Sequence, residues 1–116
     1  MSEPLGREWR FYVDDMIGCA EKVASYTAGM DLQAFVASGL VYDATLRNLE
    51  LIGEAATHVP EAVRVAHPRV SWRMVVATRN RLIHGYLGID NDTLWSIVVS
   101  DVPVLLAELR ALRSAL

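Results

Sequence analysis

Apolar residues recur every three or four positions along most of this chain, and this spacing constrains the fold more than any other feature. Over residues 7–27 the apolar positions with this spacing are Trp9, Val13, Met16, Ala20 and Val23. Because an α-helix turns once every 3.6 residues, such a stripe covers one side of a helix and has to pack against a partner. No convincing strand pattern competes with it. The chain is therefore predicted to be all-α.

The same spacing divides the chain into four main helices and two short helical turns, predicted over residues 7–27, 31–37, 41–58, 61–66, 72–84 and 92–116. Glycine or proline follows most of these segments, as is usual where helices stop. Pro103 lies inside the last apolar stripe and is expected to kink or split that helix. The predicted architecture is an up-and-down helical bundle, with residues 1–116 forming one domain.

Composition limits where such a protein works and what it binds. The net charge is −3, whereas a generic nucleic-acid binder usually carries a basic excess, so RNA would have to be handled at a local site. Cys19 is the single cysteine and cannot form an internal disulfide, which favours the reducing cytoplasm and a small buried thiol. No secretion signal and no apolar run of about 18 residues is present, so a cytoplasmic protein without membrane contact is expected.

One position in the predicted helix over residues 72–84 departs from its apolar stripe. Arg79 occupies a position that the periodicity assigns to the core, between Val76 and Leu82. A guanidinium there must be paired or must open onto a cleft, because an unpaired buried charge is costly. Two interpretations follow: an ion pair with Glu50 or Glu54 of the predicted helix over residues 41–58, or a functional site.

His84 lies five residues after Arg79, at the predicted end of the same helix. On an ideal helix the two side chains are about 140° apart, with about 7.5 Å of rise between them. They would share a site only if the helix frays at Gly85 or if a second subunit supplies its own copy of the pair. A histidine at a helix C-terminus also meets the negative end of the helix dipole, which favours its charged form.

The segment from Arg79 to Tyr86, RNRLIHGY, resembles the R-x4-H-x-Y motif of HepT-like toxins in the HEPN superfamily. The run LRNLELIGEAA at residues 46–56 resembles the long core helix of that family. Residues 68–72, residues 79–90 and Trp95 then follow in the expected order, so the resemblance covers nearly the whole chain. R-x4-H alone arises often by chance, but its place inside RNRLIHGY and after the longer run makes the match more specific.

This resemblance implies the toxin of a type VII-like toxin–antitoxin pair, a metal-independent endoribonuclease that needs no cofactor. Carried over by position, Arg79 and His84 match the catalytic pair. From their places in the sequence, Asn80 and Glu54 are candidates for supporting residues, and Asn80 beside the pair would hydrogen-bond either phosphate or a neighbouring group. Tyr86 matches the tyrosine that receives AMP from the cognate antitoxin, a minimal nucleotidyltransferase of the MntA type. The expected partners are thus RNA, that nucleotidyltransferase and a second copy of the chain, with the catalytic pair at or near the cleft of the homodimer.

The two residue types suit RNA cleavage, in which the 2′-hydroxyl attacks the adjacent phosphorus. Histidine titrates near neutral pH and can move a proton. A planar guanidinium can stabilise the charge that builds on the phosphoryl oxygens. Whether His84 acts as base or acid stays open.

Two other functions remain open at this point. One is a HEPN module without activity that serves as a binding partner of a nucleotidyltransferase, and the other is a plain helical dimerisation module in which Arg79 only pairs with Glu54. An open cleft that holds both Arg79 and His84 favours the enzyme, whereas Arg79 sealed against Glu54 favours the module. The three histidines lack the spacing of metal ligands, so no metal site is expected.

Overall fold

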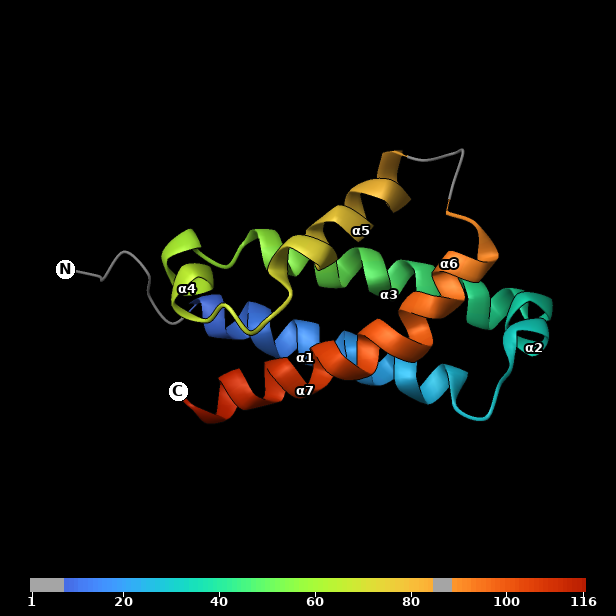
Figure 1. Cartoon of the computed structure of the whole chain (residues 1–116), viewed down its shortest axis with the longest axis horizontal. Helices are drawn as coiled ribbons and strands as arrows, with labels where there is room; N and C mark the ends of the chain where they lie inside the picture. Colours follow the sequence, from blue (N-terminus) through green and yellow to red (C-terminus); the bar gives the residue numbers. More distant parts are fainter. Residues whose placement is uncertain (1–7, 85–88) are drawn as a thin grey trace.

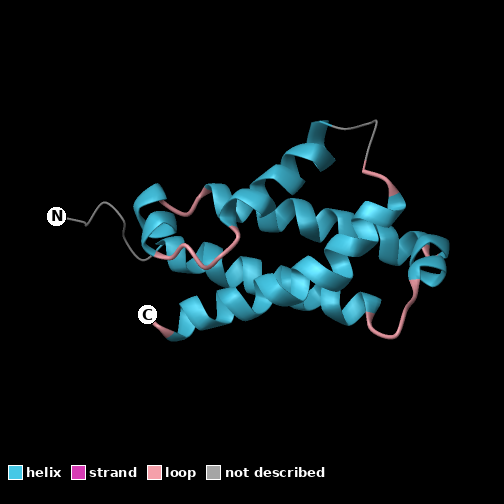
Figure 2. Cartoon of the chain, viewed as in Figure 1, coloured by secondary structure: helices cyan, strands magenta, loops and turns pink. Residues whose placement is uncertain are grey.

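The computed structural model describes residues 8–84 and 89–116, and within these residues the regular structure is entirely helical (Figures 1 and 2). Along the chain the helices are α1 (Glu8–Thr27), α2 (Leu32–Ala37), α3 (Gly39–Thr57), α4 (Glu61–Ala66), α5 (Trp72–His84), α6 (Asn91–Ser96), the π-helical turn η1 (Ile97–Asp101) and α7 (Val102–Ser114). The prediction of an all-α chain is confirmed, and the bounds of α4 and α5 agree with those predicted from the sequence.

The long helices pack in a simple order around α1 and α3. Helix α1 contacts α3 along one side and α7 along another, and α3 also contacts α5. In Figure 1, α1 and α7 lie next to each other in the lower part of the view, and α5 lies above α3. The C-terminal end of α5 rises away from the body of the bundle. The last turn of α5 is therefore the part of that helix with the least cover.

The predicted apolar stripes form the core. All five stripe residues of α1 are buried, and so are Leu49, Ile52 and Ala56 of α3. Ile83 and Leu116 continue the apolar spacing of the helices predicted over residues 72–84 and 92–116 and are expected in the core. The structure corrects both positions, since Ile83 is 46% exposed and Leu116 is 40% exposed. Ile83 lies on the projecting end of α5, and Leu116 lies beyond the end of α7, so neither has a neighbouring helix to cover it.

Side-chain caps explain where three of the helices begin. The Asp31 carboxylate accepts a hydrogen bond from the Ala34 N–H at the start of α2, at 2.8 Å, and Asp90 caps α6 through the Thr93 N–H at the same distance. Ser38 ends α2 and caps α3. Such caps satisfy N–H groups that have no partner inside the helix.

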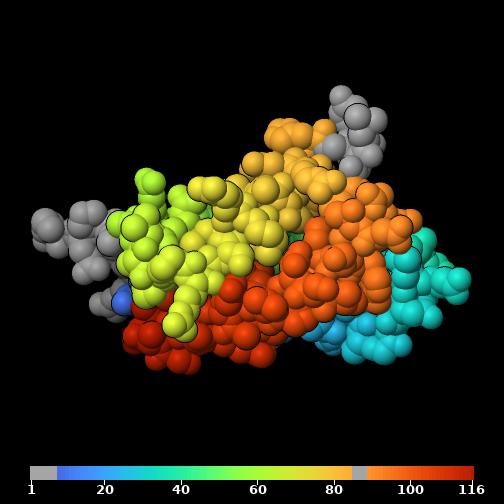
Figure 3. Space-filling view, viewed as in Figure 1, coloured from blue at the N-terminus to red at the C-terminus, as the bar shows by residue number. Residues whose placement is uncertain are grey.

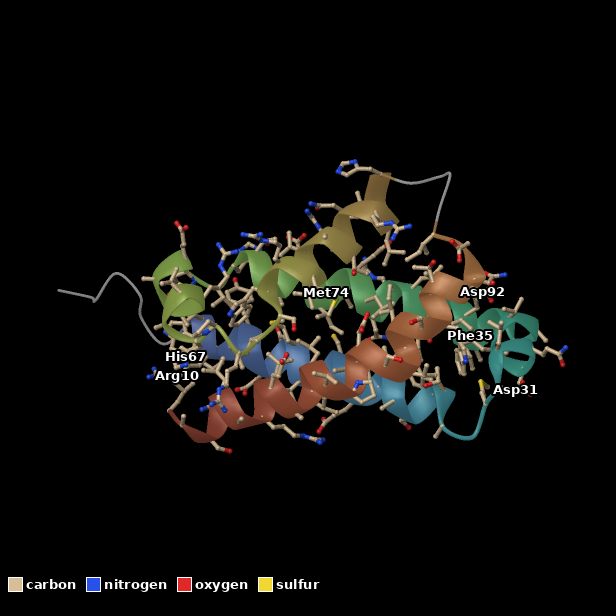
Figure 4. All side chains as sticks on the ribbon, viewed as in Figure 1. Arg10, Asp31, Phe35, His67, Met74 and Asp92 are labelled. Atoms are coloured by element: carbon tan, nitrogen blue, oxygen red, sulfur yellow. The ribbon has the colours of Figure 1, made fainter. Side chains whose placement is uncertain are left out.

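At one end of the bundle, aromatic side chains hold α2, α3 and α6 together. The Phe35 ring, labelled in Figure 4, is fully buried and its centroid lies 5.3 Å from that of Tyr42 and 5.0 Å from that of Trp95. The Tyr42 hydroxyl also donates a hydrogen bond to Asn91 Oδ1 at 2.9 Å. These contacts fix the start of α6, the first helix after the end of α5.

The helix predicted over residues 92–116, with a kink or split expected at Pro103, is divided into α6, η1 and α7. In η1 the Val102 N–H donates to the carbonyl of Ile97, five residues earlier, and Pro103 then stands at the start of α7 without an N–H to donate. Leu94, Val98 and Val102 are spaced by four and would drift by about 80° on an ideal α-helix. The wider turn keeps all three buried.

Candidate active site

Arg79 is held against α3 by a glycine. Gly53 is buried, and a Cβ atom built on it would overlap the Cβ of Arg79 and lie 2.9 Å from the carbonyl oxygen of Val75. Only a residue without a side chain therefore allows α5 to approach α3 this closely. Glycine in a helix interior costs roughly 0.5–1 kcal/mol relative to alanine, so the close approach is made at a cost to α3.

The guanidinium of Arg79 has two hydrogen-bond acceptors. Its Nη2 donates to Glu54 Oε1 at 2.7 Å, and its Nη1 donates to Asn80 Oδ1 at 3.0 Å. Of the two acids that the sequence suggested as partners, the structure thus selects Glu54; Glu50 instead pairs with Arg47 at 3.5 Å. The Nε atom of Arg79 is buried and has no acceptor among the described residues.

The Arg79–Glu54 ion pair is partly open to solvent. The Arg79 side chain keeps 26% of its surface exposed and that of Glu54 keeps 48%. The guanidinium is therefore neither sealed in the core nor free in solution. A phosphate can reach the guanidinium from the solvent side, either by displacing Glu54 or by binding the guanidinium together with Glu54.

Glu54 also joins Arg79 to a histidine that the sequence analysis did not place in the site. The Glu54 Oε2 atom lies 3.3 Å from His58 Nε2, one helical turn later in α3. The His58 ring in turn stacks on Tyr12 of α1, with ring centroids 4.7 Å apart and planes 18° from parallel. The spacing of four between Glu54 and His58 was the available signal, because residues four apart are neighbours on a helix surface.

His84 lies apart from this chain of contacts. It is exposed and forms the last residue of α5, which stays α-helical up to that point. The helix does not fray at His84, so His84 is not turned toward Arg79. The two side chains therefore leave α5 in directions about 140° apart. Within one chain, the structure does not bring Arg79 and His84 onto one face. Tyr86 lies outside the described residues, as do Gly85 and Gly88.

An acidic groove borders the site on the side of α1. It lies between α1 and α3, has a volume of about 440 Å³, and is lined among others by Asp14, Asp15, Cys19, Glu54 and His58. Burial raises the pKa of the Cys19 thiol above its usual value, and the neighbouring Lys22 opposes this effect. The carboxylates make this groove unfavourable for a phosphate, which leaves the α5 side as the approach to Arg79 for an anion.

Among residues 8–84 and 89–116, no group of three or more His, Cys, Asp or Glu side chains is placed to hold a metal ion. None of the described helices is both long and apolar enough to cross a membrane.

The family described as ribonuclease HepT-like matches residues 16–112, which include α3, α5 and both Arg79 and His84. The chain belongs to the HepT-like ribonuclease family. It is 37% identical over 97 residues to a protein of Methanocaldococcus jannaschii named as a candidate RNase, covering 84% of this chain and 89% of that protein.

A second relative, from Thermococcus cleftensis, is named as a candidate ribonuclease HepT. It is 32% identical over 109 residues, which cover 94% of this chain and 99% of the relative. No solved structure matches the chain significantly. The similarity to both relatives therefore extends over almost the full length of each.

Proposed function

We propose that this protein is the toxin of a type VII-like toxin–antitoxin pair and works in the cytoplasm as a metal-independent endoribonuclease, with Arg79 and His84 as its catalytic residues. The observation that carries the proposal is the state of Arg79. Its guanidinium is held in a fixed place by Gly53 and Glu54, yet it remains partly exposed on a helix that bears no acidic residue. Membership of the HepT-like ribonuclease family supports the same function.

In the proposed reaction the 2′-hydroxyl oxygen of RNA attacks the adjacent phosphorus, and the bond from phosphorus to the 5′-oxygen breaks. The products are a 2′,3′-cyclic phosphate and a free 5′-hydroxyl. One proton leaves the 2′-hydroxyl and one is delivered to the 5′-oxygen. His84 mediates one of these two transfers, while Arg79 stabilises the negative charge on the non-bridging phosphoryl oxygens.

A homodimer supplies the missing proximity between the two residues. Because α5 keeps Arg79 and His84 about 140° apart, one chain presents them on different sides of the helix. A two-fold axis near the exposed end of α5 would bring Arg79 of one copy close to His84 of the other. Ile83, which is 46% exposed beside His84, supplies apolar surface for that contact.

The test is expression of the toxin without its partner, with growth and RNA integrity as readouts. We expect the wild-type chain to stop growth and degrade RNA, and we expect His84→Ala and Arg79→Ala to do neither. His67→Ala is the control, because His67 lies in the connection from α4 to α5 and its carbonyl, which accepts from Trp72 Nε1, is retained in the variant. Cleavage by purified His84→Ala protein would remove His84 from the mechanism, and loss of wild-type cleavage in a chelator would contradict the metal-independent reaction.

Tyr86 is the proposed site of control. AMP transferred to its hydroxyl by the cognate nucleotidyltransferase would add a bulky group and a negative charge two residues from His84, which would repel RNA. Mass spectrometry of the protein co-expressed with that partner should locate the adduct on Tyr86, and Tyr86→Phe should remain toxic in the presence of the partner. An adduct on another residue would remove Tyr86 from this role.

The ion pair between Arg79 and Glu54 also supports a second candidate function, a HEPN module without activity that binds a nucleotidyltransferase. In that case Arg79 serves only to join α5 to α3. The two functions differ in one measurement, since Arg79→Ala and His84→Ala would leave growth unchanged relative to the wild-type chain if the module has no activity.

A further inference from the structure

Positive charge is concentrated in one stretch of this acidic protein. Residues 58–84 carry five arginines and a single acid, Glu61, whereas the rest of the chain carries six Lys or Arg residues and thirteen Asp or Glu residues. The stretch comprises α4, α5 and their connection. In Figure 3, α4 and the first part of α5 lie next to each other on the face toward the viewer.

The arginines of this stretch differ in how far their charges are neutralised. In the described part of the chain, ion pairs with carboxylates are made by Arg47, Arg79, Arg110 and Arg113. Arg64 of α4 and Arg73 of α5 take part in none of these pairs. The buried Nε of Arg64 also lacks an acceptor among the described residues. Two guanidinium groups on adjacent helices are thus available to an anion.

Arg64 and Arg73 line the same groove between α4 and α5. Its volume is about 790 Å³, and its walls also include Val65, Pro68 and Ala77. Glu61 is the single carboxylate among the lining residues. The groove therefore combines two cations with apolar wall, which suits a chain of phosphates that carries ribose and base groups.

The groove leads along α5 toward His84. Arg73, Ala77 and His84 are related by spacings of four and seven, so they lie on one side of the helix. All three are exposed, and so is Asn80 between Ala77 and His84. The rise from Arg73 to His84 is about 16 Å on an ideal helix. A single strand bound along this side of α5 would extend from the groove to the proposed catalytic histidine.

We propose that the α4–α5 groove is an RNA-binding subsite in which Arg64 and Arg73 bind phosphates of the strand upstream or downstream of the cleaved bond. The proposal rests on the proposed ribonuclease function and names how the substrate is held. It also explains how a protein with a net charge of −3 binds a polyanion: the contact is local and shares no lining residue with the acidic groove between α1 and α3. Arg81 is not included, because its charge lies close enough to Asp90 to lower the pKa of that carboxyl.

The experiment measures RNA binding without cleavage. Single-stranded RNA labelled with a fluorophore is titrated with His84→Ala protein, and with the same protein carrying Arg64→Gln and Arg73→Gln, across a series of salt concentrations. We expect the double substitution to raise Kd at least tenfold. We also expect the slope of log K against log salt to become shallower by about 1.4, because each phosphate contact with a single strand contributes about 0.7.

The matched control removes two positive charges elsewhere. Arg110→Gln and Arg113→Gln change the net charge by the same amount, but these arginines pair with Glu21 and Asp14 on α1. Their loss should leave the Kd for RNA and the salt slope close to those of the His84→Ala protein. Circular dichroism of each protein verifies that the fold is retained. Equal weakening by the control pair, or unchanged binding by the groove variant, overturns the proposal.

Two further measurements distinguish this RNA-binding subsite from the proposed ribonuclease function and from a groove that binds an acidic protein. Cleavage of RNA by the wild-type chain tests the proposed function alone: active wild-type protein with unchanged binding by the groove variant overturns only the subsite, whereas inactive protein with a groove-dependent Kd overturns only the ribonuclease function. A labelled polyglutamate peptide tests an acidic protein as the occupant. Binding of that peptide as tight as that of RNA, with the same dependence on Arg64 and Arg73, would overturn RNA as the ligand.

Discussion

Gly53 of α3 lies directly against the side chain of Arg79, with no room for another carbon atom between the two helices. The close approach of α3 and α5 therefore sets the position of the Cβ and Cγ atoms of Arg79, from which the rest of the side chain extends. Glu54, the next residue of α3, then orients the guanidinium through its 2.7 Å contact. Two successive residues of α3 thus place and orient a single charge on α5.

Substitution of Gly53 by alanine should displace α5. The added Cβ meets Arg79 close to the backbone and the Val75 carbonyl oxygen at 2.9 Å, and neither group can rotate away. We expect the free energy of unfolding to fall by about 1–3 kcal/mol, the usual cost of overpacking. RNA cleavage should fall further than stability alone explains, because Arg79 moves. Chemical denaturation and a cleavage assay measure the two effects.

Gly18→Ala in α1 is the control for that experiment. Gly18 also lies inside a helix, but a Cβ there meets nothing within 4 Å. We expect this substitution to raise the free energy of unfolding by roughly 0.5–1 kcal/mol and to leave cleavage unchanged. Equal stability of the Gly53→Ala and Gly18→Ala proteins would show that α3 and α5 are not held at this distance in solution.

Glu54→Gln should change kcat and KM in the same direction. The carboxylate holds the guanidinium in place, so its loss should lower kcat. The same carboxylate repels a phosphate, so its loss should also lower KM. The ion pair is partly exposed, and its loss should cost less than about 1 kcal/mol of stability. Steady-state kinetics on a short RNA separate the two constants, and a raised KM would contradict this account of Glu54.

The site contains two histidines with different relations to Arg79, and substitution distinguishes them. His58 is joined to Arg79 through Glu54, whereas His84 lies on the same helix as Arg79 but on another side. We expect His84→Ala to abolish cleavage and His58→Ala to reduce it less than tenfold. His58→Phe retains a ring to stack on Tyr12 and separates the loss of the ring nitrogens from the loss of packing. Abolished cleavage in His58→Phe would instead assign the proton transfer to His58.

The fold was largely predictable because apolar spacing and burial depend on the same helical geometry. The stripe of α1 is buried as predicted, and α5 extends from Trp72 to His84 as predicted. The division of the last helix was predictable only at Pro103. The position of η1 depends on how Leu94 and Val98 pack into the core formed by the other helices. The sequence of residues 92–116 alone does not show where those helices lie.

The candidate site was predictable in its residues and less so in its contacts. A guanidinium inside an apolar stripe indicated Arg79 and limited its partner to Glu50 or Glu54, and the structure selected Glu54. The role of Gly53 could not be inferred, because the sequence does not show which residue of a neighbouring helix packs against a helical glycine. The stacking of Tyr12 on His58 likewise joins residues 46 positions apart and depends on how α1 packs on α3.

The acid dependence of stability should include a contribution from Asp90. The hydrogen bond from the Thr93 N–H, followed by that from the Thr93 hydroxyl, lowers the pKa of this carboxyl below its usual value of 3.8. A lowered pKa in the folded state means that the carboxylate stabilises the fold above about pH 4 and loses this effect as the pH falls through the folded-state pKa. The stability of α6 should therefore decrease in acid.

Asp90→Asn and Asp90→Ala test this expectation by thermal melting. Asparagine caps helices about as well as aspartate, so Asp90→Asn should melt like the wild type at pH 7 and lose less stability than the wild type below pH 4. Asp90→Ala should have a lower Tm at pH 7. Parallel pH profiles for the wild type and Asp90→Asn would show that this carboxyl does not contribute to the acid dependence.

The π-helical turn η1 also has a consequence for how relatives of this chain align. A π turn holds one residue more than the α turn it replaces, so it is equivalent to a single inserted residue that the helix accommodates without a loop. A relative with a regular helix at this place would need a gap of one residue within 97–101, and the buried positions on either side of the gap would then coincide. Removing Val99 or Ser100, which are exposed, should therefore convert η1 into an α turn and leave α6 and α7 in nearly the same rotational phase. Asn91 would then keep its place beside the Tyr42 hydroxyl to which it is hydrogen-bonded, so relatives can differ by one residue at η1 without a change in how α6 packs.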